Sequence, residues 1–137
     1  MRLLGIDYGT RRIGLAISDA TGMIARPLDT IQRTALEDDL KKIEAAIEQF
    51  QPGEIVIGLP VSMNGQSSEK TEEVINFIDK MKKSIKIPIA QWDERLTTVI
   101  GERMLIDSGV RRENRKNMID KVAAVVILQS YLDSKTK

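Results

Sequence analysis

The sequence contains no cysteine and no histidine, and these two absences exclude several classes of site. Without cysteine there are no disulfides and no thiolate ligands for a metal. Without histidine there is no Ser-His-Asp or Cys-His catalytic arrangement and no histidine-ligated zinc. Any acid–base chemistry in this chain therefore rests on carboxylates, lysine, tyrosine or metal-bound water.

Long hydrophobic runs and a strong charge imbalance are also absent. The apolar runs are far shorter than the roughly 18 residues that span a bilayer, and Asp7 comes too early for a secretory segment. We therefore expect a cytoplasmic protein with no membrane partner. The formal net charge of +1 argues against a uniformly basic nucleic-acid binder but leaves room for a local basic face. The length of 137 residues predicts a single domain over residues 1–137.

Two apolar runs near the N-terminus predict a β-hairpin. Residues 3–6 and 13–17 flank a short polar loop that contains Gly9. This pattern is typical of a hairpin with a connection of three to five residues. Asp7 stands where the first strand leaves the core, so it is either a turn residue or a ligand for a cation. The hairpin alone leaves both interpretations open.

The rest of the chain alternates between helix and strand patterns. Residues 23–31 predict a third strand, which Pro27 places at a sheet edge or at a bulge. A capping box over Thr34–Glu37 predicts the start of a helix that ends at Pro52-Gly53. The pattern then predicts a buried strand over 54–60, a helix over 69–83, a strand over 87–92, a helix from Thr97 or Thr98 to 107, a basic loop over 110–116 and a last helix from Asn117 to 132.

This order predicts an α/β fold whose sheet mixes antiparallel and parallel strands. Three strands, opening with the antiparallel hairpin, are followed by helix, strand, helix, strand and two helices. The two crossovers add parallel strands, which predicts a five-stranded mixed sheet with helices on both faces. In such sheets ligands bind beyond the carboxyl ends of the parallel strands. Asp7, Pro60 and Glu94 each end or follow one of those strands.

Three acidic residues are candidates for a metal site, namely Asp7, Glu94 and Asp120. Each also has a purely structural interpretation. Asp7 could be a turn residue, Glu94 could belong to a solvated charge cluster, and Asp120 could be an acid that favours a helix N-terminus. Packed together, however, their carboxylates would repel one another unless a cation joined them. Mg²⁺ or Mn²⁺ suits such oxygen ligands, and two ions about 4 Å apart serve in phosphodiester cleavage.

Basic residues beside these acids indicate a polyanionic partner. Arg11 and Arg12 lie next to Asp7, and a basic run over residues 111–116 leads into Asp120. This run is either a solvated loop or a phosphate-binding surface, and phosphate contacts position a nucleic acid without reading its sequence. The predicted nucleic-acid-binding residues are Arg11, Arg12, Arg95, Arg111, Arg112, Arg115 and Lys116.

Four motifs, in this order, resemble those of the YqgF family over essentially the whole chain. They are residues 7–16, Gly58-Leu59-Pro60 with Asn64-Gly65, residues 93–98 and residues 120–124. The family comprises bacterial RNase H-like proteins described as pre-16S ribosomal RNA nucleases and as Holliday junction resolvase-like. The resemblance implies an acidic site at Asp7, Glu94 and Asp120, supported by loop residues Gly9, Thr10, Pro60, Asn64, Gly65, Thr97 and Thr98. Such proteins often have an aspartate where this chain has Asn64.

We therefore expect a metal-dependent endonuclease that hydrolyses phosphodiester bonds. The resemblance implies that its substrate is the 5′ end of pre-16S ribosomal RNA, processed during ribosome biogenesis. The alternatives are a Holliday junction resolvase-like endonuclease acting on branched DNA, a non-catalytic RNA-binding module, and a fragment of an actin-like ATP-binding protein. The last is considered because Asp-x-Gly-Thr also opens the actin-like ATPases, although 137 residues supply one lobe where those proteins have two. The sequence leaves the oligomeric state open.

Overall fold

The structure is a computed structural model that describes residues 1–60, 68–94 and 112–135. Within the last of these segments, side chains are described from residue 122 onward. In the described part of the chain, no helix is both long and apolar enough to cross a membrane.

The predicted N-terminal hairpin is confirmed. Strand β1 (Leu3–Tyr8) pairs antiparallel with β2 (Arg12–Ser18), and the register places Asp7 opposite Gly14. The backbone N–H of Gly9 donates to the carbonyl of Arg12 across the loop at 3.0 Å. A Cβ at Gly9 would lie 2.5 Å from that carbonyl oxygen, so the tight connection requires glycine. Asp7 lies inside β1, one residue before its end.

The single strand predicted over residues 23–31 is wrong in detail, because the chain forms two short strands there. Strand β3 (Ala25–Pro27) and strand β4 (Ile31–Gln32) both pair antiparallel with β2. Between the two strands, Asp29 and Thr30 are exposed and do not pair with β2. The pairing with β2 begins again at Ile31. The prediction that Pro27 lies at an edge is confirmed, since β3 is the outermost strand on this side.

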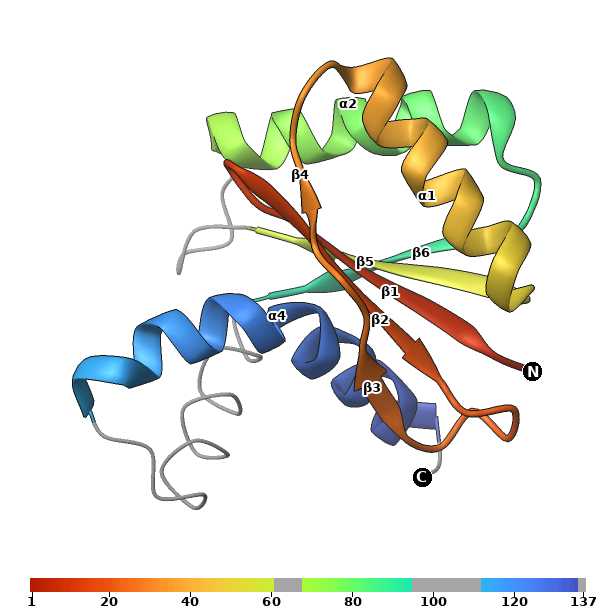
Figure 1. Ribbon diagram of the computed structural model, residues 1–137. Helices are drawn as coiled ribbons and strands as arrows, with labels where there is room; N and C mark the ends of the chain where they lie inside the picture. Colours follow the sequence, from red (N-terminus) through yellow and green to blue (C-terminus); the bar gives the residue numbers. More distant parts are fainter. Residues whose placement is uncertain (61–67, 95–111, 136–137) are drawn as a thin grey trace.

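Two crossover helices build the parallel half of the sheet, as predicted. Helix α1 (Leu36–Phe50) leads to β5 (Glu54–Leu59), which pairs parallel with β1. Helix α2 (Glu69–Ser84) leads to β6 (Ile89–Asp93), which pairs parallel with β5. The strand order is β3-β2-β1-β5-β6, with β4 beside β2, so the mixed sheet has six strands where five were predicted (Figure 1).

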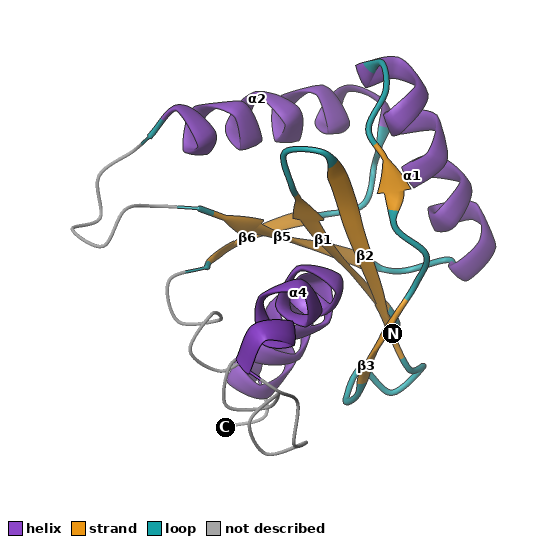
Figure 2. Ribbon diagram, turned by 60° about the vertical axis from the view of Figure 1, so that its left-hand side comes forward, coloured by secondary structure: helices purple, strands orange, loops and turns teal. Residues whose placement is uncertain are grey.

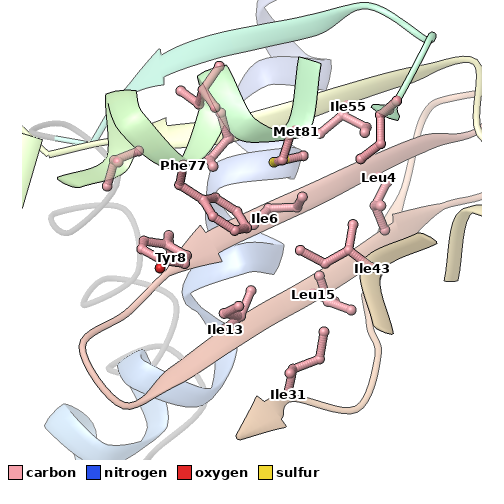
Figure 3. Close-up of a cluster of buried hydrophobic side chains, with 14 of the residues drawn as sticks. Leu4, Ile6, Tyr8, Ile13, Leu15, Ile31, Ile43, Ile55, Phe77 and Met81 are labelled. Atoms are coloured by element: carbon pink, nitrogen blue, oxygen red, sulfur yellow. The ribbon is translucent and has the colours of Figure 1, made fainter. Parts of the chain in front are cut away.

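Helices cover both faces of this sheet. Helices α1 and α2 lie on one face, and α4 (Arg112–Lys135) lies on the other (Figure 2). Side chains alternate between the two faces along each strand. In β5, Ile55 and Ile57 join the core under α1 and α2, whereas Val56 joins the core under α4. Figure 3 shows the first of these cores, in which side chains from β1, β2 and β5 meet those of the two crossover helices.

Helix α4 packs very closely on the N-terminal hairpin because β1 carries a glycine there. A Cβ at Gly5 would lie 2.8 Å from the Cβ of Leu128 and 3.1 Å from the backbone oxygen of Ala124. Farther along the hairpin, the Cβ position at Gly14 lies 3.5 Å from the Cβ of Ala124 and 3.6 Å from that of Asp7. From Leu128 back to Ala124, helix α4 therefore runs from Gly5 toward Asp7, so its N-terminal part lies on the Asp7 side.

The predicted helix starts are only partly correct. The capping box at Thr34–Glu37 is wrong: Ala35 occupies the N-cap position, and its side chain makes no cap hydrogen bond. The buried carboxylate of Asp39 instead accepts the Thr34 backbone N–H at 3.1 Å. For α2, Ser68 is the N-cap and accepts the Thr71 N–H, consistent with the caps expected in that loop.

The last helix starts earlier than predicted. It begins at Arg112 rather than Asn117, so Arg112, Arg115 and Lys116 belong to a helix and not to the predicted basic loop. Arginine, glutamate and lysine are strong helix formers, and their propensity outweighs the capping preference of Asn117. The predicted helix from Thr97 or Thr98 to residue 107 falls outside the described residues.

Candidate functional site

Three segments that are distant in sequence end at one pocket of about 440 Å³. Asp7 comes from β1, Pro60 directly follows β5, and Glu94 directly follows β6. The backbone N–H of Glu94 donates to the carbonyl of Leu59 at 3.2 Å, which extends the pairing of β5 and β6 by one step. Because β1, β5 and β6 are parallel, their carboxyl ends share one edge of the sheet, and the three residues meet there.

The carboxyl groups of Asp7 and Glu94 form a hydrogen-bonded pair. Burial, the negative charge of Asp7 and this hydrogen bond together raise the pKa of Glu94 to about 8. At neutral pH and without a cation, Glu94 therefore keeps a proton that the two carboxyl groups share. A divalent cation would replace that proton and let both carboxyl groups ionise, so the donor set suits a hard metal ion.

A glycine in β5 makes room for this pair. A Cβ at Gly58 would lie 2.5 Å from Oε1 of Glu94 and 2.5 Å from Cδ1 of Ile127 on α4. Any side chain here would displace the Glu94 carboxyl group or the helix. Gly58 was noted in the sequence only as part of a motif, but a glycine inside a buried strand is itself a signal of close approach.

The third predicted acid, Asp120, lies on α4 four residues, or one helical turn, before Ala124. Ala124 is the residue that lies against Gly14, next to Asp7. The side chain of Asp120 falls outside the described residues. Among the residues that are described, no group of three acids forms a metal cluster. The participation of Asp120 in the site stays a prediction.

The loop after β1 brings positive charge to the same pocket. Gly9, Thr10, Arg11 and Arg12 line it together with the two acids, and the side chains of the last three are exposed. Asp7 and Arg12 also line a second hollow of about 320 Å³, which lies beside residues 27–30. Asp7 is therefore flanked by concave surface on two sides, with Arg12 shared between them.

Arg33, which the sequence did not single out, holds this loop in place. Its guanidinium donates to the carbonyls of Gly9 at 2.9 Å and Thr10 at 3.1 Å. The same group lies 4.2 Å from the ring centroid of Tyr8 and pairs with Glu73 at 2.8 Å. Tyr8 in turn stacks on Phe77 of α2, as their adjacent rings in Figure 3 illustrate. A lone arginine between a strand and a helix carries no sequence signal of such a role.

Lys70, in the first turn of α2, is a further pocket residue that the sequence did not single out. Of the remaining predicted residues, Arg112, Arg115 and Lys116 lie in the first turns of α4, with side chains outside the described part. The residues that lie wholly outside the described segments are Asn64, Gly65, Arg95, Thr97, Thr98 and Arg111.

Comparisons of sequence relate the chain to a family of nucleases. The family described as "RuvX: Holliday junction resolvase" matches residues 1–134. A protein from Halothermothrix orenii named "Putative pre-16S rRNA nuclease" is 47% identical over 137 residues, which is 100% of this chain and 98% of that protein. A protein of the same name from Desulforamulus reducens is 45% identical over 137 residues and is covered completely, as is this chain.

Comparisons of structure identify the fold. RuvC from T. thermophilus, solved in complex with a Holliday junction substrate, superposes with a TM-score of 0.58 at 14% identity, over 99% of this chain and 96% of that one. The Holliday junction resolvase of fowlpox virus superposes with a TM-score of 0.53 at 12% identity, over 98% and 99% of the two chains. The predicted RNase H-like α/β fold is confirmed.

Proposed function

The chain belongs to the RuvX family, and we propose that it is a metal-dependent endonuclease that processes the 5′ end of pre-16S ribosomal RNA. As a member of this family it is a nuclease that hydrolyses phosphodiester bonds. The choice of RNA as substrate is supported by the names of the relatives that match it over their whole length. The observation that carries the mechanism is the hydrogen-bonded Asp7–Glu94 pair in a pocket rimmed by arginines.

We propose that Asp7, Glu94 and Asp120 hold Mg²⁺ or Mn²⁺. When bound between carboxylates, such ions activate water and stabilise the leaving oxygen of a phosphodiester. The chain's own contribution is to hold Asp7, in β1, and Glu94, directly after β6, side by side through the pairing of both strands with β5. Gly58 leaves the space in which the Glu94 carboxyl group lies.

The loop over residues 9–12 is proposed to bind the phosphates of the substrate. Arg11 and Arg12 are exposed on the rim of the pocket that holds the carboxyl pair. Because Arg33 ties the loop down through two carbonyl oxygens, both arginines are presented from a fixed backbone. Contacts of this kind set the register of a nucleic acid on the protein, whatever its base sequence.

Branched DNA is the second candidate substrate. It is favoured by the description of the matching family as Holliday junction resolvase. The chemistry at the carboxyl pair would be the same for both substrates, so the site described above does not separate them. The difference between them is one of substrate shape, and it calls for a direct comparison.

The experiment is Mg²⁺-dependent cleavage of a model precursor RNA, run beside a four-way DNA junction. We expect the wild type to cut the RNA, and Asp7→Asn and Glu94→Gln to lose cleavage by orders of magnitude while still binding RNA, because the arginine loop is untouched. Asp79→Asn is the matched control, since Asp79 is an exposed acid on α2 and does not line the pocket.

Three results would contradict the proposal. Equal cleavage by the wild type and Glu94→Gln would assign the activity to a contaminant. Cleavage of the junction but not of the RNA would replace the RNA substrate with branched DNA. Loss of activity in Asp79→Asn would show that the effect of the other two variants is not specific to the pocket.

A further inference from the structure

We infer that Lys70 binds a phosphate oxygen of the nucleic acid directly beside the Asp7–Glu94 pair, an inference that rests on the proposed nuclease function. No motif in the sequence points to this residue. Of the residues that the structure describes, it is one of nine that line the pocket of the carboxyl pair, and it belongs to α2.

The backbone of Lys70 is anchored at the pocket by its neighbour. The hydroxyl of Thr71, which is buried, donates to the carbonyl oxygen of Pro60, the residue that ends the β5 side of the pocket. Ser68 caps the same turn by accepting the Thr71 N–H at 3.2 Å. The hydrogen bond from Thr71 to Pro60 attaches the first turn of α2 to the carboxyl end of the sheet. It thereby fixes the backbone position of Lys70 at the pocket.

The ammonium of Lys70 has unused hydrogen-bonding capacity. Its Nζ is buried and makes no hydrogen bond to any residue in the described part of the chain. Its ion pair with Oε1 of Glu73 is long, at 3.7 Å, and Arg33 already holds that oxygen at 2.8 Å. Its other interactions are with the ring of Tyr8, whose centroid lies 5.2 Å away, and with the nearby charge of Glu94 in the pocket.

A buried ammonium without a hydrogen-bond acceptor is unfavourable, and it carries three donors. The side chain is 31% exposed, so its flexible stem reaches solvent although its tip does not. The side chain already lines the pocket of the carboxyl pair. A phosphate oxygen placed there gains a charge-assisted hydrogen bond and relieves the unsatisfied donors. Lysine suits this purpose as a compact point charge.

The competing interpretation is that Lys70 is structural and interacts only with Glu73, Tyr8 and the charge of Glu94. The two interpretations differ in their dependence on salt. A phosphate contact releases counterions, so its loss lowers the salt dependence of binding by about one unit of slope. A structural contact changes stability and leaves that slope alone. The variant Lys70→Met separates them, because methionine keeps most of the apolar stem and removes the charge.

The experiment measures binding of a model precursor RNA to the full chain at several salt concentrations in EDTA, where metal-dependent cleavage does not occur. We expect Lys70→Met to bind about tenfold more weakly with a shallower salt slope, and Lys70→Arg to keep the wild-type slope. The control is Lys80→Met, an exposed lysine on the same helix outside the pocket, which should match the wild type. Thermal melting without RNA should show Lys70→Met at least as stable as the wild type.

An unchanged affinity and slope in Lys70→Met would overturn the inference, as would weaker binding with an unchanged slope and a lower melting temperature. A wild type that binds no RNA would also overturn it. Because the binding assay contains no metal, its result does not depend on cleavage. A wild type that binds RNA through Lys70 but never cuts it in Mg²⁺ would refute the proposed substrate. The role of Lys70 would still be supported.

Discussion

At the scale of single residues, the site depends on a pair of acids that do not both ionise at neutral pH without a cation. Asp7 lies in β1 and Glu94 directly follows β6, the strands on either side of β5, and the two side chains share a hydrogen bond. In solution each group would be ionised at neutral pH. Burial against α4 and mutual repulsion reverse this for Glu94. The pair therefore couples the stability of the protein to pH and to metal.

The first consequence is a pH-dependent stability of the metal-free protein. The pKa of Glu94 is raised from 4.5 to about 8 by burial and by Asp7. Because the folded state has the higher pKa, the stabilisation by the bound proton is fully present below pH 4.5 and is lost as the pH rises through about 8. We expect thermal melts in EDTA to show the wild type losing about 1–3 kcal/mol relative to Glu94→Gln over this range.

The metal provides the reciprocal check on that measurement. At about pH 8, Mg²⁺ should stabilise the wild type, because an ion that binds only the folded state raises its stability. Glu94→Gln should respond weakly, since one ligand is lost. If the wild type and Glu94→Gln follow the same stability curve from about pH 5 to about pH 9, the two carboxyl groups do not share a proton in the metal-free protein.

At the scale of elements, the distance between helix α4 and the sheet is set by glycines. Gly5, Gly14 and Gly58 all lie under α4, but they differ in how much space they leave. At Gly14 a Cβ would make ordinary contacts of 3.5 Å and 3.6 Å. At Gly58 it would overlap with both Glu94 and Ile127. This difference gives a matched pair of variants in β2 and β5, the two strands that flank β1.

We expect Gly58→Ala to lower the free energy of unfolding by about 1–3 kcal/mol, because the methyl group forces α4 or Glu94 to move. Cleavage should fall further than stability alone explains, since the added methyl group would also overlap with the Glu94 carboxyl group. Gly14→Ala should remain near the wild type in both respects. Chemical denaturation and the cleavage assay at a temperature where all three proteins are folded would measure this. An equal loss in the two variants would argue against a specific role for Gly58.

At the scale of the whole molecule, the charge is nearly balanced, so nucleic-acid binding must depend on where the charges lie. The net charge is +1, and arginines gather at residues 11–12 and 111–115. Lysines 80, 82 and 83 lie exposed toward the C-terminal end of α2 and do not line the pocket of the acids. Local charge, rather than overall charge, is expected to govern binding.

A charge-matched comparison tests this expectation. The triple variant Arg111→Ala, Arg112→Ala, Arg115→Ala should bind all substrates more weakly, with a shallower salt dependence, because fewer counterions are released. Cleavage at saturating RNA should partly recover, since the acids are intact. The control variant Lys80→Ala, Lys82→Ala, Lys83→Ala loses the same three charges and should bind like the wild type. Equal weakening in both variants would show that only the net charge matters.

The sequence by itself determined those features that depend on local periodicity and chain direction. The hairpin follows from two apolar runs around Gly9, and the two crossovers follow from alternating strand and helix patterns. Parallel strands then bring their carboxyl ends to one edge, so Asp7, Pro60 and Glu94 converge on one pocket. Each of these inferences uses short-range patterns and general rules of topology.

Only the tertiary structure decided the features that depend on contacts between distant residues. The split of residues 23–31 into β3 and β4 reflects pairing with β2, and the start of α1 is held by buried Asp39 rather than Glu37. Arg33 holds the loop after β1 from 24 residues away, and Lys70 lines the pocket from α2. Such roles leave no local pattern, because the close packing that creates them is formed by the folded chain as a whole.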